Sequence, residues 1–176
     1  MNSSVHSLPS LEREFVLLPN EPYAVAFRPK FHQVSIFYES EFLLIDSRTQ
    51  NRLHRFPVGF PPDIYFTTSV FSSTGDRLLA ANESEGRVFD LRTPERLELP
   101  GHDGGVSDLC FSPPDGKEVA TCGVDGYVRL WDTLSGRLLW KKPHQETRRP
   151  IQNLCFSPDG ESVSYTHLTL PTIYSV

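Results

Sequence analysis

One short motif recurs along the chain at nearly constant spacing, and this repeat constrains the fold more than any other feature of the sequence. In each copy a phenylalanine ends a short apolar run and precedes a segment rich in turn-forming residues. Counted from Phe27, Phe71, Phe111 and Phe156, successive copies lie 44, 40 and 45 residues apart. A period of this length indicates repeated supersecondary units that stack on their neighbours.

The third copy shows what one repeat contains. Turn signals divide it, namely a Pro-Asp-Gly segment, the pair Asp125-Gly126 and the pair Ser135-Gly136. No window of this repeat carries the apolar spacing of a helix. Four short runs are instead predicted as strands, and they are residues 106–111, 118–122, 127–131 and 138–140.

Four antiparallel strands in forty-odd residues correspond to one blade of a β-propeller. The sequence therefore predicts an all-β fold, an incomplete β-propeller with about three four-stranded antiparallel blades and the start of a fourth. We expect a partial propeller over 14–163, with a flexible N-terminus at 1–13. The expected blades are 23–58, 64–100, 101–142 and an incomplete 143–163.

The third copy also carries a specific signature. Gly101-His102 is followed after 28 residues by Trp131-Asp132, with Phe-Ser-Pro-Pro-Asp-Gly and Asp125-Gly126 between them. This arrangement resembles the repeat of the WD-repeat β-propeller family. The resemblance is strong over 101–132, good over 151–160 and weaker upstream, where Phe89-Asp90 and Ile45-Asp46 stand in place of Trp-Asp. It covers roughly residues 14–163.

The resemblance implies that His102, Thr121, Asp125 and Trp131 form a structural tetrad joined by hydrogen bonds. Buried polar groups of these kinds are costly alone, but together they can satisfy one another. The competing interpretation is a serine-hydrolase triad, in which His102 would act with an aspartate and with Ser107 or Ser112. No Gly-x-Ser-x-Gly motif is present. We therefore predict a structural role and no enzymatic activity.

The family topology implies a loop-rich binding face, called the top face, on which residues 145–150 would lie. The candidate partner-binding residues there are Asp103, Val124, Arg148 and Arg149. Segment 137–149 holds five Lys or Arg residues and one Glu. Lys141, Lys142, Arg148 and Arg149 are therefore candidate anion-binding residues.

Three functions remain open at this point. The first is a non-catalytic protein-interaction scaffold that works in a multiprotein complex. The second is a propeller that uses the basic segment 137–149 to recognise phosphate on a peptide, a phosphoinositide or RNA. The third is the non-catalytic part of a larger enzyme.

Composition narrows the partners. The net charge of −5 argues against a protein that coats nucleic acid. No nucleotide-binding glycine motif, no metal-ligand spacing and no apolar stretch of membrane-spanning length occurs. We therefore expect no cofactor, no metal, no small-molecule substrate and no membrane span. The three cysteines Cys110, Cys122 and Cys155 indicate a reducing compartment, the cytoplasm or the nucleus. Cys110 and Cys155, at equivalent repeat positions, are expected to be buried.

The C-terminal segment departs from the repeat. After Val163 the fourth copy should continue with a second strand of small residues, but the sequence from Ser164 to Val176 has no such pattern. This segment resembles translated sequencing-adaptor read-through. We therefore expect residues 164–176 to be a non-native tail and exclude them from functional reasoning.

Overall fold

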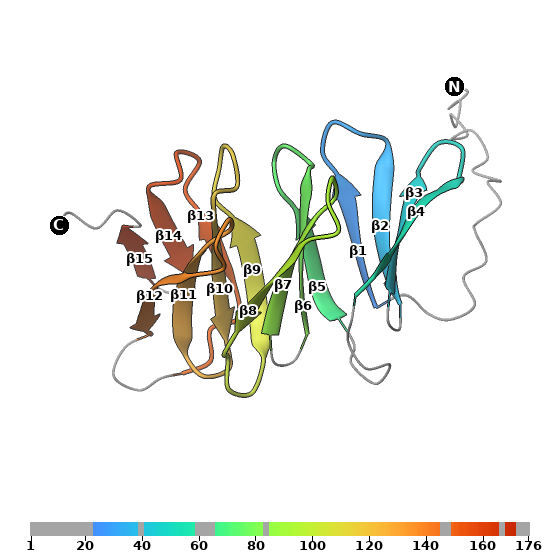
Figure 1. The fold of residues 1–176 in the computed structure, drawn as a ribbon. Helices are drawn as coiled ribbons and strands as arrows, with labels where there is room; N and C mark the ends of the chain where they lie inside the picture. Colours follow the sequence, from blue (N-terminus) through green and yellow to red (C-terminus); the bar gives the residue numbers. More distant parts are fainter. Residues whose placement is uncertain are drawn as a thin grey trace, which may run out of the picture.

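The computed structural model describes residues 23–38, 41–58, 66–82, 85–144 and 149–165, together with the backbone of 168–171. Every regular element in these ranges is a β-strand. None of these segments forms a helix, and hence none forms a membrane-spanning helix. The strands build four antiparallel sheets that stand side by side along the molecule (Figure 1). The predicted fold class is confirmed, because the chain is all-β with the sheets of an incomplete propeller.

We call the four sheets blades one to four. In each of them, consecutive strands are hydrogen-bonded neighbours. Blade one consists of β1 (Ala24–Arg28), β2 (Gln33–Tyr38), β3 (Glu41–Asp46) and β4 (Arg52–Pro57). Blade two consists of β5 (Phe66–Phe71), β6 (Arg77–Asn82), β7 (Glu85–Asp90) and β8 (Arg96–Pro100).

Blade three contains the four strands predicted from the third repeat. They are β9 (Val106–Phe111), β10 (Glu118–Gly123), β11 (Tyr127–Asp132) and β12 (Leu138–Pro143). Blade four has three described strands, which are β13 (Leu154–Phe156), β14 (Ser162–Tyr165) and β15 (Leu168–Pro171).

The core lies between the blades, where alternate residues of each strand pack on the next sheet. Blades one and two meet in a phenylalanine-rich cluster of Phe37, Phe42, Phe66, Phe71 and Phe89 with smaller apolar residues. Blades two and three meet through Leu79, Ala81, Val88, Leu99, Val106, Leu109, Val119 and Trp131. Blades three and four meet through Ala120, Cys122, Val128, Leu130, Trp140, Ile151, Leu154, Val163 and Tyr165.

The aspartate that ends the third strand of blades one to three caps the turn that follows it. The carboxylate of Asp132 accepts hydrogen bonds from the backbone N–H groups of Leu134 and Ser135 at 3.2 and 2.7 Å. Asp46 and Asp90 accept the equivalent bonds in blades one and two. Hydrogen bonds from Ser135 lower the pKa of Asp132 below its usual value. This capping explains why the aspartate recurs even where the tryptophan before it does not.

The glycine of the first hairpin has both a conformational and a packing reason. Gly116 and Gly160 have positive φ angles of 68° and 77°. A Cβ atom would lie 3.2 Å from the Cβ of Ser72 at Gly116, and 2.5 Å from the carbonyl oxygen of Pro113 at Gly160. The first hairpins of blades three and four are thus packed on the first hairpins of blades two and three.

Two predicted segments remain to be placed. Residues 1–13, predicted to be flexible, lie outside the described residues. Strand β14 continues to Tyr165, and β15 lies within the segment 164–176 that departs from the repeat. The non-native origin of that segment concerns its history rather than its conformation and stays a prediction.

Candidate functional site

The four residues of the expected tetrad are brought together in blade three. Thr121 lies on β10, Trp131 lies on β11, and Asp125 belongs to the turn between them. His102 comes from the linker that follows β8. The ring nitrogens of His102 lie 2.9 Å from Asp125 Oδ1 and 2.9 Å from Thr121 Oγ1, and Trp131 Nε1 lies 3.0 Å from the same hydroxyl oxygen.

The chemistry of the groups sets the direction of each hydrogen bond. An indole N–H can only donate, so Thr121 Oγ1 accepts from Trp131 and has its own proton for His102 Nε2. An ionised carboxylate can only accept, so His102 donates from Nδ1 to Asp125. The chain of bonds therefore runs from Trp131 through Thr121 and His102 to Asp125, with a neutral imidazole.

Burial and charge keep this protonation state. His102, Thr121 and Trp131 are each less than 5% exposed. Desolvation lowers the pKa of His102 and outweighs the hydrogen bond to Asp125, which acts to raise it. Burial acts to raise the pKa of Asp125, but hydrogen bonds from Arg129 and His102 overcome it and lower that pKa. The network thus holds a neutral histidine beside an ionised aspartate.

A fifth residue, Arg129, belongs to the same network and was missed in the sequence. It is 4% exposed, and its Nη2 atom lies 2.8 Å from Asp125 Oδ2. Its Nη1 atom lies 2.6 Å from Nδ1 and 3.2 Å from Nε2 of His102. The lone pairs of Nδ1 and Nε2 point in different directions in the plane of the imidazole. The Nη1 atom of Arg129, which is close to both nitrogens, therefore lies over the face of the ring. The burial of Arg129 could have been predicted from its position two residues before Trp131, because residues two apart lie on the same face of a strand.

The other blades fill the equivalent positions differently. In blade two, Phe89 stands in place of the tryptophan and Ala80 in place of the threonine, as the strand pairing shows. Both belong to the phenylalanine-rich cluster. In blade four, Tyr165 stands at the threonine position, and its ring meets the buried His144 edge-on at 5.4 Å. Among the described residues, the full polar network occurs only in blade three.

The catalytic interpretation requires a serine beside His102. Both ring nitrogens of His102 have partners in the network, and neither Ser107 nor Ser112 is among them. Ser112 lies at the first hairpin and accepts a hydrogen bond from the backbone N–H of Glu118 at 3.0 Å. The network therefore lacks the serine of a hydrolase triad. Its one hydroxyl, that of Thr121, is 1% exposed and also accepts the hydrogen bond from Trp131, which fits a structural role.

Three top-face segments of blade three are tied together by backbone hydrogen bonds. Val124 N–H donates to the carbonyl oxygen of Gly105 at 3.1 Å, and Ile151 N–H donates to that of Gly123 at 3.2 Å. His144 N–H donates to Gly126 at 2.7 Å. The linker before the blade, its second hairpin and the segment after the blade therefore form one connected surface.

This surface carries three of the four candidate partner-binding residues. Asp103 and Arg149 are exposed, and Val124 is 47% exposed although it is apolar. Arg148 falls in 145–148, outside the described residues.

The candidate anion-binding residues do not form one described surface. The ammonium group of Lys141 lies 3.9 Å from the centre of the Tyr127 ring, and that of Lys142 lies 5.5 Å from the Trp140 ring. As neighbours on β12, the two lysines project to opposite faces of the blade.

The three cysteines differ in their surroundings. Burial raises the pKa of Cys110 to about 12 and also raises that of Cys122. Cys155 is exposed and Cys110 is half-buried, so the expectation of burial was wrong for Cys155 and is met only in part by Cys110. Its strand, β13, presents alternate residues to blade three and to the opposite side. Within the described ranges, no group of three His, Cys, Asp or Glu side chains is placed to hold a metal ion.

Comparison with known proteins supports the repeat assignment. Residues 94–132 match the family described as WD domain, G-beta repeat. This range contains His102, Thr121, Asp125 and Trp131, together with Arg129.

Three curated relatives illustrate the range of similar proteins. THO complex subunit 3 of Arabidopsis thaliana is 38% identical over 101 residues, which are 54% of this chain and 31% of the relative. Small ribosomal subunit protein RACK1z of Arabidopsis thaliana is 44% identical over 64 residues, 36% of this chain and 18% of the relative. An uncharacterised WD repeat-containing protein of Synechocystis is 30% identical over 125 residues, 69% of this chain and 34% of the relative. The chain thus spans about a third or less of each of these proteins.

Proposed function

Because this chain belongs to the WD-repeat family, we propose that it acts as a non-catalytic platform that binds other proteins through its top-face loops. WD-repeat domains are generally non-catalytic, and the only hydroxyl bonded to the histidine of the polar network, that of Thr121, is 1% exposed. The observation that carries the proposal is the backbone bonding of three top-face segments into one surface.

The mechanism is preorganisation. The network holds the linker through His102, and the linker is bonded to the second hairpin through Gly105 and Val124. Loops that are already ordered lose little conformational entropy when a partner binds. Val124 then supplies an exposed apolar contact, and Asp103 and Arg149 supply exposed charges on the two segments bonded to its hairpin.

The proposed partners are proteins of a multiprotein assembly in the cytoplasm or nucleus. The names of two relatives support this, since one is a subunit of the THO complex and another a protein of the small ribosomal subunit. Fusion to a catalytic domain in a longer protein is compatible with the same role for these blades.

Phosphate recognition by segment 137–149 is the weaker alternative. Lys141 and Lys142 each lie against an aromatic ring on opposite faces of the blade, so they do not converge on one anion. Salt-sensitive binding that is abolished by Arg148→Ala with Arg149→Ala would favour this alternative over the scaffold.

The scaffold proposal is tested with variants of the top face. We expect Val124→Glu with Asp103→Lys to reduce specific partner capture, measured by quantitative mass spectrometry and then with the purified partner. The matched control is Leu134→Glu, because Leu134 is 70% exposed in the turn at the other end of β11. Equal loss in both variants, or loss in neither, would contradict a top-face site.

A further inference from the structure

The third strands of blades two and three carry a buried arginine at the same position. Arg87 of β7 is paired with Glu98 of β8, and Arg129 of β11 is paired with Lys141 of β12. The two arginines are only 6% and 4% exposed, although arginine side chains usually lie at the surface. Each stands two residues before the tryptophan position of its blade, so both point toward the preceding blade.

In blade two the buried arginine binds the segment that enters the blade. The Nη1 atom of Arg87 donates a hydrogen bond of 2.7 Å to the carbonyl oxygen of Val58. Val58 is the first residue after β4, and it is fully buried. The Nη2 atom of Arg87 lies 2.9 Å from a carboxylate oxygen of Glu85 and 3.0 Å from one of Glu98. The two carboxylates therefore neutralise and orient a guanidinium that holds the chain where it leaves blade one.

Blade three uses the position in the same way but with different partners. The guanidinium of Arg129 lies over the ring of His102, which belongs to the linker that enters this blade. The same guanidinium lies 2.8 Å from a carboxylate oxygen of Asp125 in the second hairpin. The linker is in turn bonded to this hairpin between Gly105 and Val124. Arg129 is therefore attached to both top-face segments that meet at Val124.

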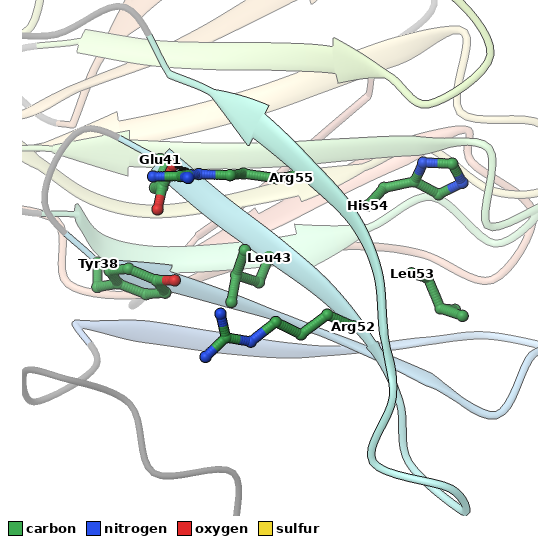
Figure 2. A pocket seen from close by; sticks show the side chains of 7 residues that line it. All are labelled: Tyr38, Glu41, Leu43, Arg52, Leu53, His54 and Arg55. Atoms are coloured by element: carbon green, nitrogen blue, oxygen red, sulfur yellow. Dashed lines mark hydrogen bonds and ion pairs between the residues drawn. The ribbon is translucent and has the colours of Figure 1, made fainter.

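Blade one has an apolar residue at the equivalent position. Leu43 of β3 is paired with Arg55 of β4, and Figure 2 shows both side chains. Leu43 is 2% exposed and belongs to a small apolar cluster with Tyr38 and Ile45. An alkyl side chain can neither donate a hydrogen bond to a carbonyl oxygen nor pair with a carboxylate. Among the described side chains, the buried arginine thus occurs in blades two and three, and the fold of a blade does not require it.

We propose that Arg87 and Arg129 are positioning residues of the top face, and that each fixes the linker entering its blade in the conformation that a partner protein binds. This inference rests on the proposed top-face function, and it extends the ordered surface to the start of the linker into blade two. A buried guanidinium suits the role, because a charge without acceptors is costly in the interior and the linker cannot leave without exposing that cost. Both side chains are almost fully buried, so they act on a partner only through the linkers.

Amide hydrogen exchange of the full chain, followed by mass spectrometry, tests the proposal without a partner. Methionine has nearly the length of arginine but no charge and no donor, so Arg129→Met and Arg87→Met each remove one set of bonds. We expect Arg129→Met to speed exchange roughly tenfold in peptides that contain Gly105 and Val124. Arg87→Met should do the same in peptides that contain Val58. Each variant is the matched control of the other, because it removes a similarly buried guanidinium from a different blade.

The conservative variants Arg129→Lys and Arg87→Lys keep the charge and N–H donors, so each should restore about half or more of the protection lost in the methionine variant. Circular dichroism checks that the sheets are retained. If a methionine variant loses its sheets, the lysine variant is compared with the unchanged chain and should speed exchange only in its own linker. Equal acceleration of both linkers by one variant, or no acceleration of its own linker, overturns the proposal.

Capture of the partner purified with the top-face variants separates this proposal from the proposed function. We expect Arg129→Met to reduce capture, as Val124→Glu with Asp103→Lys does. If the top-face variant reduces capture and Arg129→Met does not, although its linker is loosened, the positioning role is wrong. If neither reduces capture, the top-face function is wrong, and the exchange result alone decides whether the arginines fix the linkers.

Discussion

Replacing Thr121 with valine tests whether the blade-three network stabilises the fold. Valine has nearly the shape of threonine, so Thr121→Val removes the hydroxyl without opening a cavity. Two buried groups then lose a partner, since the Thr121 hydroxyl bonds both His102 Nε2 and Trp131 Nε1. The side chain is 1% exposed, so water does not readily replace the lost hydroxyl.

The expected cost follows from these two unpaired groups. Each buried polar atom left without a partner costs about 1–3 kcal/mol. We expect about 2–3 kcal/mol for Thr121→Val, because small shifts of the imidazole recover part of the loss. This corresponds to roughly a 30- to 140-fold increase in the local opening equilibrium of β10 and β11.

Amide hydrogen exchange measured by mass spectrometry reports this local opening. Thr68→Val is the matched control, since Thr68 is half-buried on β5 of blade two and lies outside the network. Its expected effect is below about 0.5 kcal/mol. A change of less than roughly threefold in the protection of β10 and β11 by Thr121→Val would refute a stabilising network.

The double variant Thr121→Val with Trp131→Phe gives a second test of the same reasoning. Once the indole N–H is gone, it no longer needs the hydroxyl, so the second substitution adds little. We expect the double variant to cost clearly less than the sum of the two single variants. Strict additivity would mean that the two side chains stabilise the blade independently.

Three further predictions follow from the surroundings of single residues. The pKa of His102 is lowered in the folded chain, so just below pH 6.5 only the unfolded chain binds a proton at this histidine. We therefore expect the melting temperature of blade three, followed by tryptophan fluorescence, to be steady above pH 7 and to fall below about pH 6.5. The melting temperature of His102→Gln should depend less on pH over this range. Gly123→Ala would place a Cβ atom 2.5 Å from the ring of His102, so it should lower the free energy of unfolding by about 1–3 kcal/mol in urea denaturation. Gly86→Ala is the control and should be tolerated, because its Cβ atom would meet only ordinary contacts at 3.6 Å or more. Iodoacetamide should label the exposed Cys155 well before the buried Cys122, as peptide mass spectrometry would show, and equal labelling of both would contradict the described burial.

The strands and turns could be predicted from the sequence because their signals are local. The aspartate at 132 caps its own turn through backbone groups two and three residues ahead. Gly116 adopts a positive φ angle that glycine favours at a hairpin. These turn requirements are local, so the spacing of such residues alone indicates where each blade begins to turn.

What the sequence did not predict depends on contacts between distant segments. An arginine on a strand usually lies at the surface, and only the arrival of His102 and Asp125 from two loops explains the burial of Arg129. The basic segment likewise gave a net charge but not a geometry. Here the missing signal was local, because the predicted strand ended at Trp140, whereas β12 continues to Pro143 and its alternation places Lys141 and Lys142 on opposite faces.

Blades two and three show two physical solutions to the same packing problem. Blade three buries hydroxyl, imidazole, carboxylate and indole groups that satisfy one another, whereas blade two has Phe89 and Ala80 at the tryptophan and threonine positions. Replacing all members of a buried polar network by apolar groups can leave stability nearly unchanged, although removing one member does not. The Trp-Asp signature therefore marks the polar solution only. Blades one and two both lack the tryptophan and both keep the turn aspartate, as Asp46 and Asp90. Blade two also keeps a hairpin glycine, Gly75, whereas the first hairpin of blade one has Lys30 at a positive φ of 64°. The aspartate is therefore the residue by which such a repeat can be recognised.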